Sequence, residues 1–253
     1  MKNIVRLLQG DCNALFEKLE DSSIDLIVTD PPYGVGYSVG FDDSLEYVKS
    51  NIEFWLKQMY RVLKEGRHCY IFIPTKQAGL WLSQIQEVFT FNNILTVRNY
   101  TTSQHSKNNF QYNNQLIVYC SKGIPNDLHL YDFFKTSESW LNDSRNKNPN
   151  LYTYTYPAFI GSCFANVKRT RSKQDNGHPC AKNPELLRLL VNLSSNPGDV
   201  VFDPFMGGGS TGLTALNEQR GFVGIEKNTE YFNTLKESFE SVAVWRDTTI
   251  QYD

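Results

Sequence analysis

The sequence predicts an α/β fold with a doubly wound, mostly parallel sheet of about seven strands. One observation is that short apolar runs alternate with longer stretches whose apolar residues recur at helical spacing, which is typical of parallel sheets covered by helices. A second is that two of the runs, 24–28 and 199–202, lead directly into segments rich in proline, glycine and acid. Ligands of such sheets bind at the carboxyl ends of the strands.

The individual elements follow from periodicity and from turn residues. Strands are expected at 3–9, 24–28, 68–73, 94–98, 115–120, 199–202 and 222–225. Helices are expected at 12–19, 44–64, 76–89, 185–193, 211–219 and 229–240. The second helix is the clearest, and Gly66 is expected to end it. The strands at 94–98 and 115–120 are joined by a loop, so we expect them to form an antiparallel edge.

Composition excludes several classes of protein. The 253 residues include no run of 18 apolar residues, so no membrane span is expected, and the N-terminus has no signal-peptide pattern. Five scattered cysteines without C-x-x-C spacing predict reduced thiols in a cytoplasmic protein. Four histidines without paired spacing predict no metal site. The net charge of −2 means that nucleic-acid binding would need a local concentration of positive charge.

That concentration lies in a polar stretch, from 124 to about 180, in which helical and strand periodicity disappears. Four basic residues fall within six positions there: Lys168, Arg169, Arg171 and Lys173. A solvated loop is the ordinary interpretation of such a run, and contact with phosphates is the functional one. Tyrosine and phenylalanine residues around the run favour nucleic acid.

The first chemical motif is the segment that follows the run 24–28, which reads Asp30-Pro31-Pro32-Tyr33-Gly34. The prolines leave free carbonyl acceptors, Asp30 adds a carboxylate and Tyr33 an aromatic face. This set suits an exocyclic amine on a flat ring. Taken alone, two prolines after a strand also fit a simple turn. The glycine-rich loop that follows is either a lid over a bound base or an ordinary exposed turn.

The second motif is a glycine-rich turn between a strand and a helix. Gly207, Gly209 and Gly212 satisfy G-x-G-x-x-G, and Glu226 ends the next strand, so an NAD-dependent oxidoreductase is a rival interpretation. However, the carboxylate of Asp203 in the turn would repel a pyrophosphate and would suit the ammonium of a methionine moiety. Nicotinamide chemistry also does not call for Asp-Pro-Pro-Tyr.

Together these motifs resemble those of the DNA amino-methyltransferases. Residues 30–33 match the catalytic motif of that family, 203–209 match its S-adenosylmethionine motif, and Glu226 matches its ribose-binding acid. The segment 178–184 is similar to the H-P-x-x-K-P motif, although Asn183 intervenes before the proline. The catalytic motif precedes the cofactor motif, which is the β arrangement of the family.

The resemblance implies a Rossmann-like, circularly permuted class I methyltransferase fold. It divides the chain into a catalytic half (1–123), an irregular target-recognition insertion (124–177) and a cofactor-binding half (178–253). The implied catalytic residues are Asp30, Pro31, Pro32 and Tyr33. The implied cofactor residues are Asp11, Cys12, Asp30, Lys182, Asp203, Phe205, Gly207, Gly209, Ser210, Thr211, Glu226 and Lys227. The basic run 168–173 becomes the candidate DNA contact.

The function implied is site-specific transfer of a methyl group from S-adenosylmethionine to the N6 amine of a flipped-out adenine in double-stranded DNA. Cytosine N4 is the alternative target, but cytosine enzymes of the family more often carry Ser at the position of Asp30. Structured RNA is a less favoured substrate. A nucleic-acid-binding protein without catalysis is the alternative from another class. A homodimer and a cognate restriction endonuclease are compatible with this interpretation.

Overall fold

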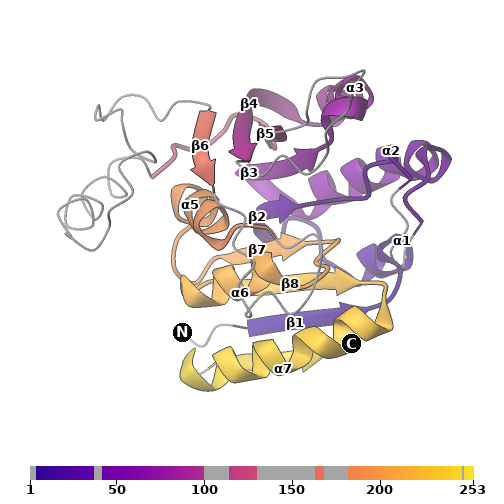
Figure 1. Ribbon diagram of the computed structural model, residues 1–253. Helices are drawn as coiled ribbons and strands as arrows, with labels where there is room; N and C mark the ends of the chain where they lie inside the picture. Colours follow the sequence, from indigo (N-terminus) through magenta and orange to yellow (C-terminus); the bar gives the residue numbers. More distant parts are fainter. Residues whose placement is uncertain (1–3, 37–41, 100–113, 130–162, 168–181, 247) are drawn as a thin grey trace.

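The computed structural model describes residues 4–36, 42–99, 114–129, 163–167, 182–246 and 248–253. These residues form one nine-stranded sheet in the order β6-β4-β5-β3-β2-β7-β8-β1-β9 (Figure 1). The strands are β1 (Ile4–Gln9), β2 (Ile24–Thr29), β3 (Leu63–Ile73), β4 (Thr90–Asn99), β5 (Asn114–Ser121), β6 (Cys163–Val167), β7 (Val200–Asp203), β8 (Gly221–Glu226) and β9 (Thr249–Tyr252). Strand β5 runs antiparallel to both β3 and β4, and the other strand pairs are parallel.

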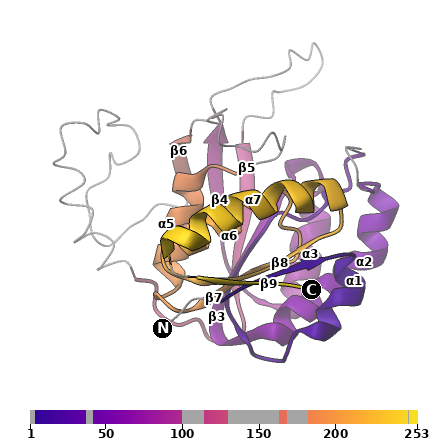
Figure 2. The ribbon, with the colours of Figure 1, turned by 90° about the horizontal axis from the view of Figure 1, so that it is seen from below.

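Helices cover both faces of the sheet (Figures 1 and 2). One face carries α1 (Cys12–Leu15), α2 (Leu45–Val62) and α3 (Ala78–Val88), with the short 3₁₀ turns η1 (Phe16–Lys18) and η2 (Thr75–Gln77). The other face carries α5 (Pro184–Ser194), α6 (Ser210–Asn217) and α7 (Thr229–Arg246). A doubly wound architecture follows from this arrangement, as the alternation of elements predicts.

The second half of strand β3 shows why a central strand is apolar on both of its faces. Successive side chains point to opposite faces of a sheet. Cys69 and Ile71 accordingly pack among α2 and α3, whereas Tyr70 and Phe72 pack among α5, α6 and α7. All four are at most 2% exposed. A strand between two helical layers therefore has no solvent face on which a polar residue would be favoured.

The centre of the sheet is a topological switch point. Strands β2 and β7 are parallel neighbours. From β2 the chain passes through α2 to β3, and from β7 it passes through α6 to β8, on opposite sides of this pair. Connections that diverge in this way leave a crevice outside the carboxyl ends of the two strands. The two predicted motifs begin at those ends, at Asp30 and Asp203.

The chain order of the strands agrees with a circular permutation. The first strand, β1, pairs with β8 and β9 from the end of the chain. Figure 2 shows β1 and β9 side by side. The division into 1–123, 124–177 and 178–253 stays a prediction, and both outer segments contribute strands to the same sheet.

All seven expected strands are present, and the structure adds β6 and β9. Strand β6 lies inside the segment that lacks periodicity, and it pairs with β4. The predicted antiparallel pairing of β4 and β5 is confirmed, but the pair is not an edge because β6 follows β4 in the sheet.

The predicted end of the second helix was wrong. Helix α2 stops at Val62, and Gly66 lies inside β3, where its N–H donates to Lys122 O at 2.8 Å. The left-handed φ of Gly66, 73°, serves an irregularity of the strand and not a helix cap.

Asn183, which interrupts the expected H-P-x-x-K-P pattern, has a local structural role. Its side chain caps α5 by accepting hydrogen bonds from the backbone N–H groups of Glu185 and Leu186, at 2.8 and 3.2 Å. Pro184 then occupies the first turn of the helix, where its missing N–H costs nothing. The added residue thus supplies a good N-cap directly after Lys182.

Within the described part of the chain, none of the helices has the length and apolar character needed to cross a membrane.

Candidate active site

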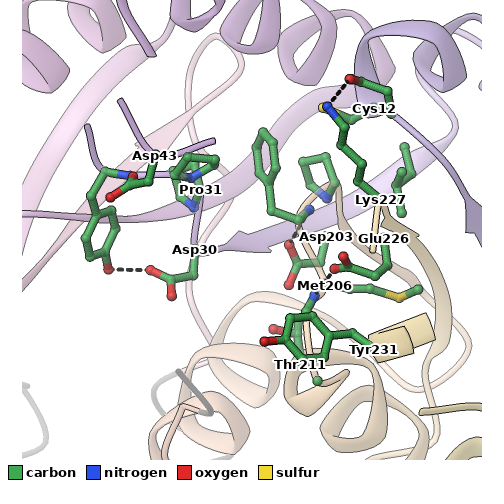
Figure 3. Close-up of a pocket in the computed structure, with 18 of the residues that line it drawn as sticks. Cys12, Asp30, Pro31, Asp43, Asp203, Met206, Thr211, Glu226, Lys227 and Tyr231 are labelled. Atoms are coloured by element: carbon green, nitrogen blue, oxygen red, sulfur yellow. Dashed lines mark hydrogen bonds and ion pairs between the residues drawn. The ribbon is translucent and has the colours of Figure 1, made fainter. Parts of the chain in front are cut away.

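A cavity of about 420 Å³ opens at the switch point. All four predicted catalytic residues line it, and so do all predicted cofactor residues except Gly209. Figure 3 shows Asp30, Pro31 and Asp43 on the N-terminal half of the fold, facing Asp203, Thr211 and Glu226 on the C-terminal half. The fold therefore brings together two motifs that are far apart in the sequence. Thr29, directly before the first motif, donates a hydrogen bond to Asp203 of the second, 174 positions later.

Gly209 is required by backbone geometry. Its φ is 77°, in the left-handed region, and it stands at the N-cap of α6. A Cβ atom at this position would lie 2.7 Å from Cε2 of Phe239. The turn therefore needs glycine even though this residue does not line the cavity.

Asp30 lies at the centre of the part of the pocket that the N-terminal half of the chain forms. One of its oxygens accepts a short hydrogen bond from the Tyr33 hydroxyl, and the other lies 2.5 Å from the Lys182 ammonium. Gln115 donates from Nε2 to the same tyrosine oxygen at 2.9 Å. The Lys182 nitrogen also lies over the rings of Phe72 and Tyr33, 5.0 and 5.8 Å from their centroids. Lys182, predicted as a cofactor residue, thus contacts Asp30, the carboxylate predicted to be catalytic, directly.

A residue that the sequence did not single out holds the backbone of this motif. Asp43 is 4% exposed, and its carboxylate accepts N–H bonds from Tyr33, Gly34 and Val35 at 2.5, 2.8 and 3.3 Å. An acid after a glycine-rich loop carries no recognisable sequence signal. Only the folded loop shows that this carboxylate turns back toward the segment after the prolines.

Asp203 is the most buried of the acids that line the cavity, at 3% exposed. Its Oδ1 accepts the Thr29 hydroxyl at 2.7 Å and the Phe205 N–H at 3.1 Å. Burial raises the pKa of this carboxyl from 3.8 to about 7, and the nearby charge of Asp30 adds to the increase, although these hydrogen bonds oppose it. A cation that entered the pocket beside Asp203 would favour its ionised form.

Glu226 ends β8 and stabilises the glycine-rich turn. Its two oxygens accept N–H bonds from Gly207 at 2.8 Å and from Asn228 at 2.6 Å. Burial raises the pKa of Glu226, and the backbone hydrogen bonds lower it only in part. The carboxylate lies on the cavity wall, where it can accept hydroxyl donors of a ligand.

Asp11 and Lys227 form an ion pair of 2.8 Å at the cavity wall. Burial raises the pKa of Asp11, but the hydrogen bond from Lys227 and that from Asn13 N–H outweigh it, so the pKa lies below its ordinary value. Beside them, burial raises the pKa of the Cys12 thiol to about 12. Cys12 is therefore a neutral thiol at physiological pH and is not a nucleophile.

The chemistry of this wall fits S-adenosylmethionine and does not fit a dinucleotide. Acids from three strand ends, Asp11, Asp203 and Glu226, face the cavity, and they suit amine, ammonium and hydroxyl donors. Both lysines that line it, Lys182 and Lys227, are already paired with carboxylates. A pyrophosphate in this cavity would thus meet negative charge, which argues against the NAD interpretation.

Outside the predicted motifs, the residues that line the cavity without having been expected from the sequence include Tyr47 and Tyr231, and Met206 of the predicted cofactor motif lines it as well. Met206 is buried below the glycine-rich turn, and Tyr231 comes from the first turn of α7 (Figure 3). The residues predicted to contact DNA, Lys168, Arg169, Arg171 and Lys173, lie outside the described residues. Among the residues that are described, no cluster of His, Cys, Asp and Glu could hold a metal ion.

The sheet order, the switch-point cavity and its acidic wall fit an α/β enzyme that binds a nucleoside cofactor. A family model described as DNA methylase matches residues 24–237, and the chain belongs to this family. The DNA adenine methyltransferase YhdJ of Escherichia coli is 30% identical over 236 residues, which cover 89% of this chain and 79% of that protein. The type II methyltransferase M.HpaI of Haemophilus parainfluenzae is 30% identical over 93% of this chain and 74% of its own length.

Among solved structures, the putative DNA modification methylase TTHA0409 from Thermus thermophilus, complexed with S-adenosyl-L-methionine, aligns with a TM-score of 0.69. The alignment covers 98% of this chain and 99% of that one at 18% identity. At this identity the likeness supports the fold alone, and it confirms the predicted class I methyltransferase architecture.

Proposed function

We propose that this protein transfers a methyl group from S-adenosylmethionine to the N6 amine of adenine in double-stranded DNA. The observation that carries the proposal is the position of Asp30 and Pro31, two acceptors beside aromatic rings, on the wall of the cofactor cavity. Membership of the DNA methylase family and the name of the relative YhdJ support DNA as the substrate and adenine as the base.

In this proposal the cofactor is held by the acidic wall. Asp203 lies beside the methionine ammonium, Glu226 accepts the ribose hydroxyls and Asp11 accepts the adenine amine of the cofactor. The remaining contacts come from lining residues of the same cavity: Cys12, Phe205, Gly207, Ser210, Thr211 and Lys227. When bound, S-adenosylmethionine supplies an electrophilic methyl group on a sulfonium.

The target amine is the group that the protein must activate. Its lone pair is delocalised into the base ring, so the free amine is a poor nucleophile. Hydrogen bonds from its N–H groups to the Asp30 carboxylate and the Pro31 carbonyl favour a pyramidal nitrogen with a localised lone pair. The N–C bond would form as the S–C bond of the sulfonium breaks to leave a neutral thioether. Asp30 would stabilise the positive charge that develops on the nitrogen, and the amine proton would then pass to water. Most of the acceleration then comes from positioning and electrostatics.

The ammonium of Lys182 supports this assignment. A nitrogen donor of the protein itself already rests on Asp30 at 2.5 Å and over the rings of Phe72 and Tyr33. The site therefore accepts a nitrogen donor between a carboxylate and aromatic faces. The target base must leave the duplex to reach this site, which costs a few kcal/mol, and stacking on Tyr33 offsets about 1–3 kcal/mol of that. Lys182 has to move aside when the base amine occupies Asp30.

Cytosine N4 remains the alternative target, since it presents a similar amine to the same acceptors. We further propose a cytoplasmic location, where buried thiols such as Cys69 and Cys120 stay reduced. A cognate restriction endonuclease is proposed from the relative M.HpaI, a type II methyltransferase. A homodimer is a proposal that sedimentation of the purified protein tests.

The decisive experiment is mass spectrometry of nucleosides from unmethylated genomic DNA incubated with the protein and methyl-labelled S-adenosylmethionine. Label in N6-methyladenine supports the proposal, and label in N4-methylcytosine overturns the choice of base. Label in neither overturns the activity on DNA. The variant Asp30→Ala is expected to lose at least about 100-fold in rate while it still binds the cofactor by calorimetry. Undiminished turnover in this variant would contradict the role of Asp30.

A further inference from the structure

Asp43 stands out because its buried carboxylate accepts hydrogen bonds from three successive backbone N–H groups of the loop that follows Asp30. One oxygen accepts the N–H groups of Tyr33 and Gly34 at 2.5 and 2.8 Å, and the other accepts Val35 N–H at 3.3 Å. Its own carbonyl accepts Gly36 N–H at 2.9 Å. Three successive backbone donors that converge on one anion form a charge-assisted cradle, which is stronger than the same number of neutral hydrogen bonds.

The loop that Asp43 holds has no regular structure of its own. Gly34 and Gly36 have φ values of 73° and 76°, in the left-handed region, and two prolines precede Tyr33. Such a backbone cannot form helix or strand hydrogen bonds, so its N–H groups need another acceptor. Asp43 is that acceptor for the part of the loop that carries the aromatic side chain.

Helix capping does not explain this acid. Helix α2 begins after Ser44, whose own hydroxyl accepts Tyr47 N–H at 3.2 Å, and the Asp42 carboxylate accepts Ser44 N–H at 2.8 Å. The capping groups of α2 are thus supplied by the neighbours of Asp43. Its side chain instead turns toward the loop, next to Pro31 in the cavity wall (Figure 3).

Tyr33 connects the Asp43 carboxylate to Asp30. This residue is fixed at both ends, by its N–H on Asp43 and by its hydroxyl on Asp30 and Gln115. The aromatic face and the catalytic carboxylate are therefore set relative to each other by a buried anion outside the motif.

We propose that Asp43 is a positioning residue for methyl transfer, which acts by holding the backbone of residues 33–35 so that Tyr33 and Asp30 receive the target base in register. This inference deepens the proposed function and rests on it. It predicts that loss of the Asp43 carboxylate impairs the chemical step and leaves cofactor binding intact.

The test compares Asp43→Asn and Asp43→Ala with the matched control Asp25→Asn. Asparagine keeps the oxygen that accepts the two shorter bonds, whereas alanine removes all three. Asp25 is also a buried carboxylate, 3% exposed, which pairs with Lys64 and Arg67 and accepts Val200 N–H at 3.0 Å. It lies at the opposite end of β2, away from the cavity. Its substitution therefore measures how the loss of a buried anion by itself changes thermal stability and rate.

Single-turnover methylation, the Kd of S-adenosylmethionine by calorimetry and hydrogen exchange of the peptide that covers 30–36 are measured for each variant. We expect Asp43→Ala to lose about 100-fold in the single-turnover rate, the usual effect of misplacement by about 1 Å, and Asp43→Asn to lose less. The Kd for the cofactor should stay within about threefold, and exchange at 33–35 should accelerate most in the alanine variant. Asp25→Asn should keep the wild-type rate despite a comparable loss of thermal stability, because distant sites act independently.

The inference is overturned if Asp43→Ala and the wild type have equal single-turnover rates. It is also overturned if Asp25→Asn loses rate in proportion to its loss of thermal stability. A cofactor Kd that weakens in parallel with the rate also overturns it, because the effect would then lie in the cofactor site. If the wild type itself methylates no DNA, the proposed function fails. In that case the exchange measurement still decides whether Asp43 holds the loop.

Discussion

Because Asp203 is buried in the site, the pH dependence of the free energy of unfolding tests the environment of its carboxyl group directly. Burial is the main reason why the pKa of this carboxyl is raised from 3.8 to about 7. A raised carboxyl pKa means that the folded protein holds a proton between pH 4 and 7 which the unfolded chain has released. The free energy of unfolding therefore falls as pH rises through this window. A shift of about 3 pKa units at 1.36 kcal/mol per unit amounts to about 4 kcal/mol.

The substitution Asp203→Asn removes this titration and keeps an oxygen that can accept the Thr29 hydroxyl. Thermal unfolding of both proteins without cofactor, from pH 5 to pH 8, measures the effect. We expect the Tm of the variant relative to wild type to rise with pH, by about 5–10 °C over the range, because about 2 of the 3 pKa units lie above pH 5 and correspond to about 3 kcal/mol in a chain of this size. Parallel pH profiles of the two proteins would refute the assigned environment of Asp203.

Cofactor binding should show the opposite sign. If the ammonium of S-adenosylmethionine lies beside Asp203, binding requires the ionised carboxylate, and the affinity should increase about tenfold per pH unit below pH 7 and level off above it. The matched ligand is 5′-methylthioadenosine, which shares the nucleoside and lacks the amino acid part. Its affinity should not follow pH in this way. A pH slope that is identical for the two ligands, or that persists in Asp203→Asn, would show that another group is responsible.

Two further perturbations test other parts of the structure. Replacing the four basic residues within 168–173 by Gln should reduce the slope of log K against log salt for DNA binding by about 3 to 4; an unchanged slope would identify the run as a solvated loop. Gly209→Ala should lower the free energy of unfolding by about 1–3 kcal/mol because its Cβ would meet Phe239, 2.7 Å away, at a left-handed φ. Gly79→Ala is the control, since a Cβ there meets nothing within 4 Å of it, and it should stabilise α3 by about 0.5–1 kcal/mol. Equal Tm changes in the two glycine variants would contradict the geometry of the turn.

Most of the fold could be predicted from the sequence because the information is local. A buried strand such as 24–28 is apolar at every position except Asp25, and helix α2 repeats its apolar residues at helical spacing. The two chemical motifs are also local, since Asp30 and Pro31 follow one strand directly and Asp203 follows another. Strand ends are where open α/β sheets bind ligands, so the position of the site followed from the motifs and from the fold class together.

The sequence by itself therefore determined the class of the sheet and the two strand ends that form the cavity. Only the tertiary structure decided how these ends interact: the Lys182 ammonium on Asp30, the Asp43 carboxylate below Tyr33 and the raised pKa of Asp203. Each of these three features depends on burial or on a contact between distant segments, and the spacing of residues along the chain encodes none of them. Strands β6 and β9 were missed for the same reason, because short strands at the two edges of a sheet are defined by their neighbour and not by their own periodicity.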